Sequence, residues 1–121
     1  ISHIAIANPK LAPYGKACKE TLTALKMWNK VNHKIVIGEN VSQAFQFADS
    51  GNAEVAFIAL SQALQAKGSY WTIPQKLHEP IKQDACIIKE SKDTLAFIKF
   101  LRSDTAKKIL KSSGYLNTYV K

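Results

Sequence analysis

The chain has 121 residues, of which 46% are hydrophobic and 21% are charged, and this composition indicates a globular domain and excludes a disordered polypeptide. No apolar run approaches the roughly 20 residues that span a bilayer, which excludes a membrane helix. The net charge of +8 comes from 17 basic and 9 acidic residues, and every basic residue except Arg102 is a lysine. Because base reading in DNA favours the arginine fork, the charge predicts a solvated lysine surface and no nucleic-acid partner.

Short apolar strands alternate with amphipathic helices over the first half of the chain. The predicted strands are residues 3–7, 34–37 and 55–58, and the predicted helices are residues 15–27, 41–49 and 60–66. Each strand is a continuous apolar run, as in parallel sheets that helices cover on both faces. The pattern therefore predicts an α/β fold.

The alternation ends after Gly68. Residues 70–73 and 84–89 are predicted as further strands, separated by a proline-flanked loop and by no crossover helix. Two helices, residues 94–101 and 104–113, follow them, and the second is capped by Ser103 and stopped by Gly114. The break at residues 74–83 is the predicted hinge between two bodies.

Catalytic and metal-binding patterns are missing from the sequence. His3, His33 and His78 are isolated, and no nucleophile motif, phosphate loop or carboxylate pair accompanies them. Cys18 and Cys86 do not have a metal-site spacing, and both are predicted as buried small apolar residues. A disulfide is the alternative if their Cα atoms come within about 7 Å. An enzyme, a metal site and a cofactor are therefore not expected.

Two helix starts have the chemistry of an anion site. One follows the proline-rich loop at residues 8–13, and the other follows the short connection at residues 38–40, where Asn40 is a good N-cap and Gln43 completes a capping-box pattern. The first turn of a helix carries N–H groups without intrahelical partners and a partial positive charge. Both starts follow strand ends, where open α/β sheets bind ligands.

The predicted ligand of these helix starts is a small dianion bound by the backbone amides of Tyr14 and Val41. Pro13 stiffens the first loop, and Gly15 is expected to let the ligand approach the backbone closely. The alternative is that these are ordinary helix starts, because every α/β protein has them and most bind nothing.

Several runs of sequence around these positions resemble a known family. They are IAIANPKLAPYGKACKE at 4–20, GENVSQAFQF at 38–47, GNAEVAFIALSQA at 51–63, SYWTIPQKLHEPIKQDACII at 69–88 and KSSGY at 111–115. Together they are similar to the C-terminal half of the periplasmic molybdate- or tungstate-binding proteins of ABC transporters, which are type 2 periplasmic binding proteins.

The resemblance implies an architecture and a set of ligand contacts. Residues 1–83 would form the second, ligand-binding lobe, a three-layer α/β/α sandwich. Residues 84–121 would be a returning strand and two helices of the first lobe, whose N-terminal part is absent. The backbone amides of Tyr14 and Val41 would bind the oxyanion, supported by Pro13, Gly15 and Asn40. The tyrosine hydroxyl that some members add is missing here, because Ala59 occupies that position.

The implied function is that of the substrate-binding component of an ABC importer, which traps molybdate or tungstate between two lobes and delivers it to a membrane permease. The resemblance implies a periplasmic protein with a signal peptide in the full-length precursor. The fragment alone is expected to bind weakly or not at all. The alternative function is a ligand-sensing effector domain of a transcription regulator with the same fold.

Self-association of the fragment is also expected, because the two last helices carry apolar side chains that would lack most of their partners. These side chains are Phe97, Ile98, Leu101, Ile109 and Leu110.

Overall fold

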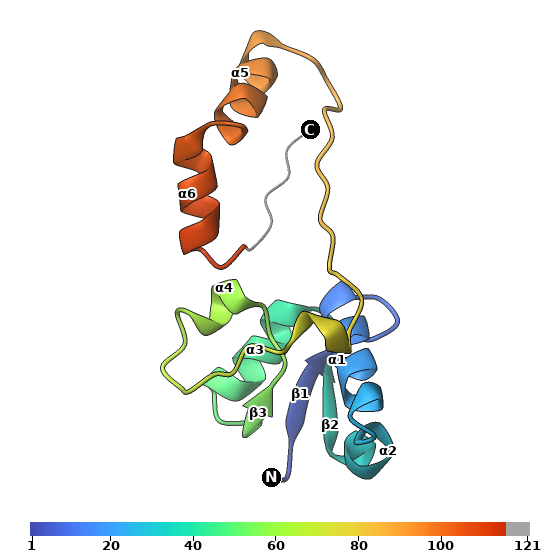
Figure 1. Cartoon of the computed structure of the whole chain (residues 1–121). Helices are drawn as coiled ribbons and strands as arrows, with labels where there is room; N and C mark the ends of the chain where they lie inside the picture. The colour runs from blue at the N-terminus through green and yellow to red at the C-terminus, as the bar shows by residue number, and fades with distance from the viewer. Residues whose placement is uncertain (116–121) are drawn as a thin grey trace. The chain divides into compact units, whose positions relative to one another are not determined.

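The structure is a computed structural model that describes residues 1–115 (Figure 1). The chain divides into two compact units, Ile1–Lys82 and Gln83–Lys121. Within the described residues, no helix has both the length and the apolar composition that crossing a membrane requires.

The first unit is built on a three-stranded parallel sheet in the order β2-β1-β3. Central β1 (Ile4–Ala7) pairs along its whole length with β2 (Ile35–Gly38), so that Ala7 lies opposite Gly38. On its other side β1 pairs with the two-residue β3 (Val55–Ala56). All four residues of β1 are buried, as expected for an apolar strand in the centre of a covered sheet.

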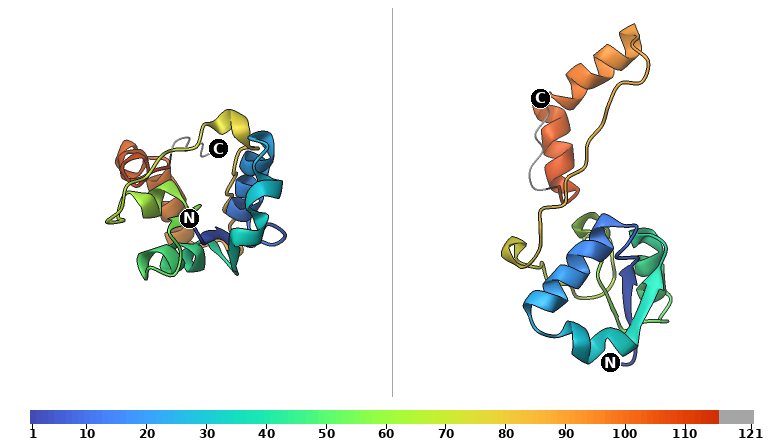
Figure 2. Two further views of the ribbon diagram at one scale, coloured as in Figure 1. Left: turned by 90° about the horizontal axis from the view of Figure 1, so that it is seen from below. Right: turned by 90° about the vertical axis from the view of Figure 1, so that its right-hand side faces the viewer.

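Helices cover both faces of this sheet (Figure 2). Ile4 and Ile6 pack with residues of α1 (Pro13–Ala24), whereas Ala5 packs with residues of α3 (Val41–Asp49). This division follows from the strand geometry, because successive side chains point to opposite faces. The result is a three-layer α/β/α arrangement, which confirms the predicted fold class.

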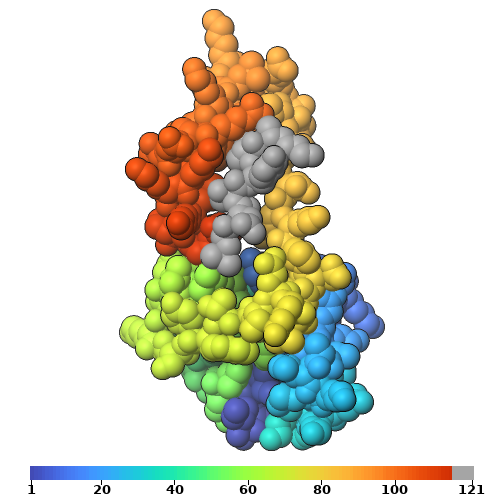
Figure 3. Space-filling view, viewed as in Figure 1, coloured from blue at the N-terminus to red at the C-terminus, as the bar shows by residue number. Residues whose placement is uncertain are grey.

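Shorter elements complete the first unit. They are α2 (Trp28–Val31), a 3-10 turn at Asn32–Lys34, α4 (Leu60–Ala63) and a 3-10 turn at Gln75–Leu77. The segment after α4 runs over the surface of this unit (Figure 3). Helix α1 ends earlier than predicted, because Lys26 adopts a positive φ of 56° and turns the chain.

The second unit contains α5 (Lys92–Leu101) and α6 (Asp104–Ser112). Each helix has a serine N-cap, Ser91 or Ser103, whose side chain accepts an N–H of the first turn. Gly114, with a φ of 94°, follows α6 as predicted. Both terminal helices are therefore confirmed.

The two predicted strands at residues 70–73 and 84–89 are wrong. Neither segment has regular structure, and Tyr70 and Trp71 are 53% and 69% exposed. A strand is stable only when its N–H and C=O groups pair with a neighbouring strand, and within residues 1–115 no strand pairs with either segment. Cys86, predicted to be buried in the second of these strands, is consequently exposed, and Cys18 and Cys86 are both free thiols.

Candidate anion-binding site

The loop that leads into α1 is folded around Asn8. The carbonyl oxygen of Asn8 accepts the N–H groups of Leu11 and Ala12 at 3.1 and 2.8 Å, and its Oδ1 accepts the N–H of Lys10 at 2.9 Å. Helix α1 then begins at Pro13, and its N-cap residue Ala12 makes no side-chain cap. The loop therefore satisfies its own amides, and no side chain of the N-cap closes the first turn that contains Tyr14.

Gly15 lies in that first turn and packs directly on the end of β1. A Cβ atom at this position would stand 2.1 Å from the carbonyl oxygen of Ala7 and 2.7 Å from the carbonyl carbon of Asn8. The glycine is buried. The contact between helix and strand by itself requires glycine here, and the close approach of a ligand at Gly15 stays a prediction.

The start of α3 is a tight connection with two reciprocal side-chain contacts. Asn40 is the N-cap, and its Oδ1 accepts the N–H of Gln43 at 2.9 Å. The Oε1 atom of Gln43 accepts the N–H of Glu39 at 2.7 Å, one residue before the N-cap that the capping-box pattern predicts. Among the described residues, no acceptor contacts the N–H groups of Val41 and Ser42. Ser42 was not predicted, although its place as the second residue of α3 is the signal that identifies it.

The fold brings these two helix starts to the same edge of the sheet. Ala7 and Gly38 are register partners at the carboxyl ends of β1 and β2, and neighbouring strands lie about 4.8 Å apart. A hydrogen bond of 2.8 Å from the N–H of Asn8 to the carbonyl oxygen of Gly38 joins the two loops directly. The loops that lead into α1 and α3 therefore leave adjacent parallel strands at the same edge of the sheet.

The charge pattern of the first turn distinguishes α1 and α3 from the two terminal helices, α5 and α6. Neither α1 nor α3 has an acidic residue in its first turn. By contrast, α5 and α6 have Asp93 and Asp104 there. Because an acidic side chain in the first turn offsets the positive end of the helix dipole, its absence from α1 and α3 leaves that potential available for an anion.

The third strand contributes little polar chemistry at this edge. Ala59 precedes α4, is 6% exposed and has no hydroxyl, and its N–H is accepted by Oε1 of Gln62 at 3.1 Å.

Within residues 1–115, the His, Cys, Asp and Glu side chains form no group of three or more that could hold a metal ion.

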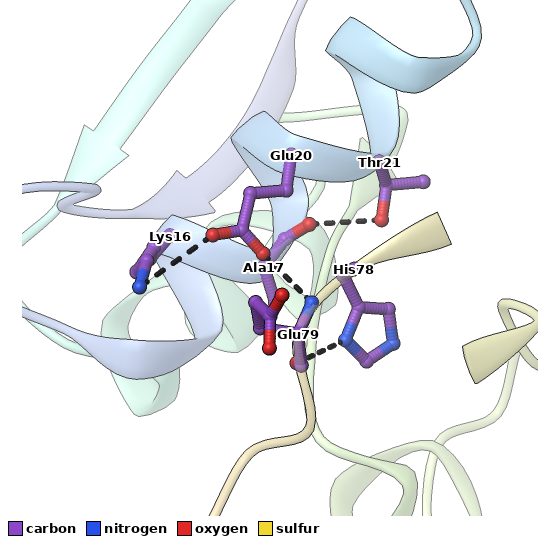
Figure 4. A network of polar contacts seen from close by, with 6 residues as sticks. All are labelled: Lys16, Ala17, Glu20, Thr21, His78 and Glu79. Atoms are coloured by element: carbon purple, nitrogen blue, oxygen red, sulfur yellow. Dashed lines mark hydrogen bonds and ion pairs between the residues drawn. The ribbon is translucent and has the colours of Figure 1, made fainter. Parts of the chain in front are cut away.

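A separate groove of about 380 Å³ lies beside α1 and includes Pro13 but not Tyr14 or Val41. Glu20 organises its wall, accepting the N–H of Glu79 at 2.9 Å and pairing with Lys16 at 3.6 Å (Figure 4). The groove is lined by Pro9, Lys10, Leu11, Ala12, Pro13, Lys16, Ala17, Glu20, Glu79, Pro80, Ile81 and Lys82. The hydrogen bond from Glu79 to Glu20 attaches the segment after the 3-10 turn at Gln75–Leu77 to α1.

Several known proteins that are similar to this chain are named as molybdate-binding proteins. The molybdate-binding proteins ModA of Rhodobacter capsulatus and Azotobacter vinelandii are 42% and 41% identical over 120 residues, which cover 96% and 93% of this chain. The solved structure of the Azotobacter vinelandii periplasmic molybdate-binding protein has a TM-score of 0.85 at 36% identity, covering 97% of this chain and 55% of that one. The substrate-binding domain of a molybdenum ABC transporter from Clostridium difficile has a TM-score of 0.77 at 30% identity, covering 98% of this chain and 54% of that one.

The chain spans about half the length of the curated relatives it matches, 48% of each of these two ModA proteins. These relatives are solute-binding proteins and not enzymes, which supports a binding role. Residues 1–116 match the family described as bacterial extracellular solute-binding protein. The chain therefore belongs to the bacterial extracellular solute-binding protein family.

Proposed function

We propose that this chain is part of the substrate-binding component of an ABC importer and that its ligand is a tetrahedral oxyanion, molybdate or tungstate. Residues 1–83 would form one ligand-binding lobe, and residues 84–121 would return to the other lobe. The anion would be trapped between the two lobes in the periplasm and passed to a membrane permease. The names of the molybdate-binding relatives support this choice of ligand.

One observation supports the proposal: α1 and α3 follow the carboxyl ends of the adjacent strands β1 and β2, and neither helix has an acidic residue in its first turn. Backbone amides at such positions bind anions because the N–H groups point at the ligand and the helix dipole favours negative charge. The amides of Tyr14 and Val41 would be the donors. Neutral donors suit a fully deprotonated dianion, because a protonated anion needs an acceptor that amides do not provide.

The same geometry supports weak binding by residues 1–121 alone. Donors at one edge of one sheet contact one side of a tetrahedral anion, and the remaining oxygens would stay in water. Full affinity would require donors from the other lobe, together with the exclusion of water on closure.

We also propose that residues 1–121 self-associate when isolated. Phe97 and Ile109 are 58% and 53% exposed, and Ile98, Leu101 and Leu110 are half-buried. Apolar surface of this kind on α5 and α6 favours association in water.

Calorimetric titration of the full-length protein that carries this chain with molybdate, tungstate and sulfate tests the proposed function. Saturable binding at one site per protein, tighter for molybdate or tungstate than for sulfate, is the expected result. The same titration on residues 1–121 should give much weaker binding or none. A full-length protein that binds none of the three anions would overturn the proposal.

A further inference from the structure

The side chain of Gln43 determines which amides remain available at the start of α3. Its Oε1 accepts the N–H of Glu39 at 2.7 Å, while its own backbone N–H donates to Oδ1 of Asn40 at 2.9 Å. The connection from β2 is so tight that a Cβ atom at Gly38 would lie 2.9 Å from the backbone nitrogen of Ala44. Gln43 therefore fixes the two-residue loop, Glu39 and Asn40, that connects β2 to the first turn of α3.

Of the four backbone N–H groups considered at the start of α3, two donate to the side chains of Gln43 and Asn40, and two have no acceptor among the described residues. The N–H groups of Glu39 and Gln43 have acceptors, and those of Val41 and Ser42 have none among the described residues. Both acceptors are side-chain amides and carry no charge. A helix N-terminus ordinarily favours carboxylates in its first turn, as Asp93 and Asp104 illustrate in α5 and α6.

We propose that Gln43 is a positioning residue of the anion site. This inference rests on the proposed function. Its uncharged side chain holds Glu39 and Asn40, the two residues between β2 and α3, so that the amides of Val41 and Ser42 face the anion together. It also satisfies the loop without placing a negative charge beside a dianion. A glutamate would make the same hydrogen bond and repel the ligand.

Gln43→Glu in the full-length protein separates these two effects, because it keeps the acceptor and adds one charge. The affinity for molybdate should fall roughly tenfold or more at low ionic strength, and the loss should shrink as salt is added. The melting temperature of the unliganded protein should stay the same or rise, because glutamate is favourable in the first turn of a helix. If Gln43 had a purely structural role, the loss of affinity would not depend on salt and would not occur together with an unchanged or raised melting temperature.

Gln46→Glu is the matched control, since it makes the same chemical change on the same helix at an exposed position. Its effect on affinity should stay below about twofold, because the end effect of a helix is confined to its first turn. Gln43→Met tests the brace itself by removing the acceptor at constant charge. Its affinity should fall several-fold, with the salt dependence of the unchanged protein.

The affinities of the unchanged protein and of the variants distinguish failure of the proposed function from failure of the inference about Gln43. If the unchanged protein binds no oxyanion, the proposed function fails and this inference fails with it. If the unchanged protein binds molybdate but Gln43→Glu binds equally well, or no worse than Gln46→Glu, only the inference about Gln43 is overturned. Wild-type affinity in Gln43→Met would likewise remove the positioning role and leave the proposed function intact.

Discussion

At Gly15 the packing of α1 on β1 leaves no space for a side chain, since a Cβ atom would stand 2.1 Å from the carbonyl oxygen of Ala7. Gly15→Ala should therefore lower the free energy of unfolding by about 2 kcal/mol or more, because helix and strand must move apart. Urea unfolding measures the change. Gly68→Ala is the control, because no atom lies within 4 Å of a Cβ there. Equal stability of the two variants would contradict the packing that we describe.

Glu54 joins the start of β1 to the chain before β3. Its carboxylate accepts the N–H groups of His3 at 2.8 Å and Ser2 at 3.2 Å, and these hydrogen bonds lower the pKa of Glu54 from 4.5 to about 2. Because the folded state favours the ionised form, its contribution to stability is complete above the ordinary pKa of 4.5. The contribution is lost as the pH falls toward 2.

Glu54→Gln removes this titration and keeps an amide oxygen as acceptor. The urea midpoint of the unchanged protein should exceed that of the variant most above pH 4.5, and the difference should close near pH 2. The effect should be small, because the carboxylate is exposed to solvent. Urea melts at a series of pH values give the two profiles, and parallel profiles would show that the hydrogen bonds do not form.

Single residues were predictable from sequence where the chemistry is local. Asn40 is the N-cap of α3 as predicted, because capping depends on a few neighbouring residues. The sequence also predicts Gln43 as a capping residue, but its Oε1 accepts the N–H of Glu39 and not that of Asn40. The need for glycine at position 15 depends on β1 across the fold, and the local sequence could not reveal it.

At the scale of elements, α3 lies close on the sheet because small side chains meet there. Ala44 of α3 and Ala5 of β1 are both 0% exposed and belong to one cluster. Ala44→Leu should cost about 1–3 kcal/mol in urea unfolding, because the larger side chain forces α3 away from the sheet. Ala96→Leu, at an exposed position of α5, controls for the residue type. A stability of Ala44→Leu that matches this control would contradict the close contact.

The segment around Cys86 offers a chemical test of the missing strand. Cys18 is buried, which raises the pKa of its thiol to about 12, whereas Cys86 is exposed. Alkylation of folded residues 1–121 at neutral pH should therefore modify Cys86 and spare Cys18, because the thiolate is the nucleophile and needs access. Mass spectrometry of the peptides identifies the modified residue, and urea should make both reactive. Protection of Cys86 in the folded chain would indicate a paired strand.

Helices were predicted more accurately than strands, and the difference is physical. Residues 41–49 form α3 as predicted, because caps and apolar periodicity are encoded within the helix itself. Residues 84–89 have the apolar character of a strand, yet a strand also needs a neighbour, and none is available in the described part of the chain. Apolar runs therefore predict strands only where the partner is also present.

At the scale of the whole molecule, the proposed site needs two sets of backbone amides at one sheet edge and a second lobe to complete it. The chain spans 48% of the length of the ModA relatives, and the edge of its sheet would present one side of the proposed site. The first turns of α1 and α3 were predicted as that side from loop chemistry and from the resemblance. Their adjacency depends on the pairing of β1 with β2, which the sequence implied only through the parallel fold.

The most direct test removes the amide hydrogen of Val41, and a second variant controls for the change of side chain. Val41 is the first residue of α3, where proline is well tolerated, and Pro13 occupies the same position in α1. Asn40 is extended, with a φ of −144° and a ψ of 175°, and is thus compatible with a following proline.

Val41→Pro in the full-length protein should keep its melting temperature and lose roughly 10- to 100-fold in molybdate affinity by calorimetry, the value of one hydrogen bond to a charged group. Val41→Ala, which keeps the N–H, should bind like the unchanged protein. Undiminished molybdate binding by Val41→Pro would contradict the claim that the amide at the start of α3 holds the anion.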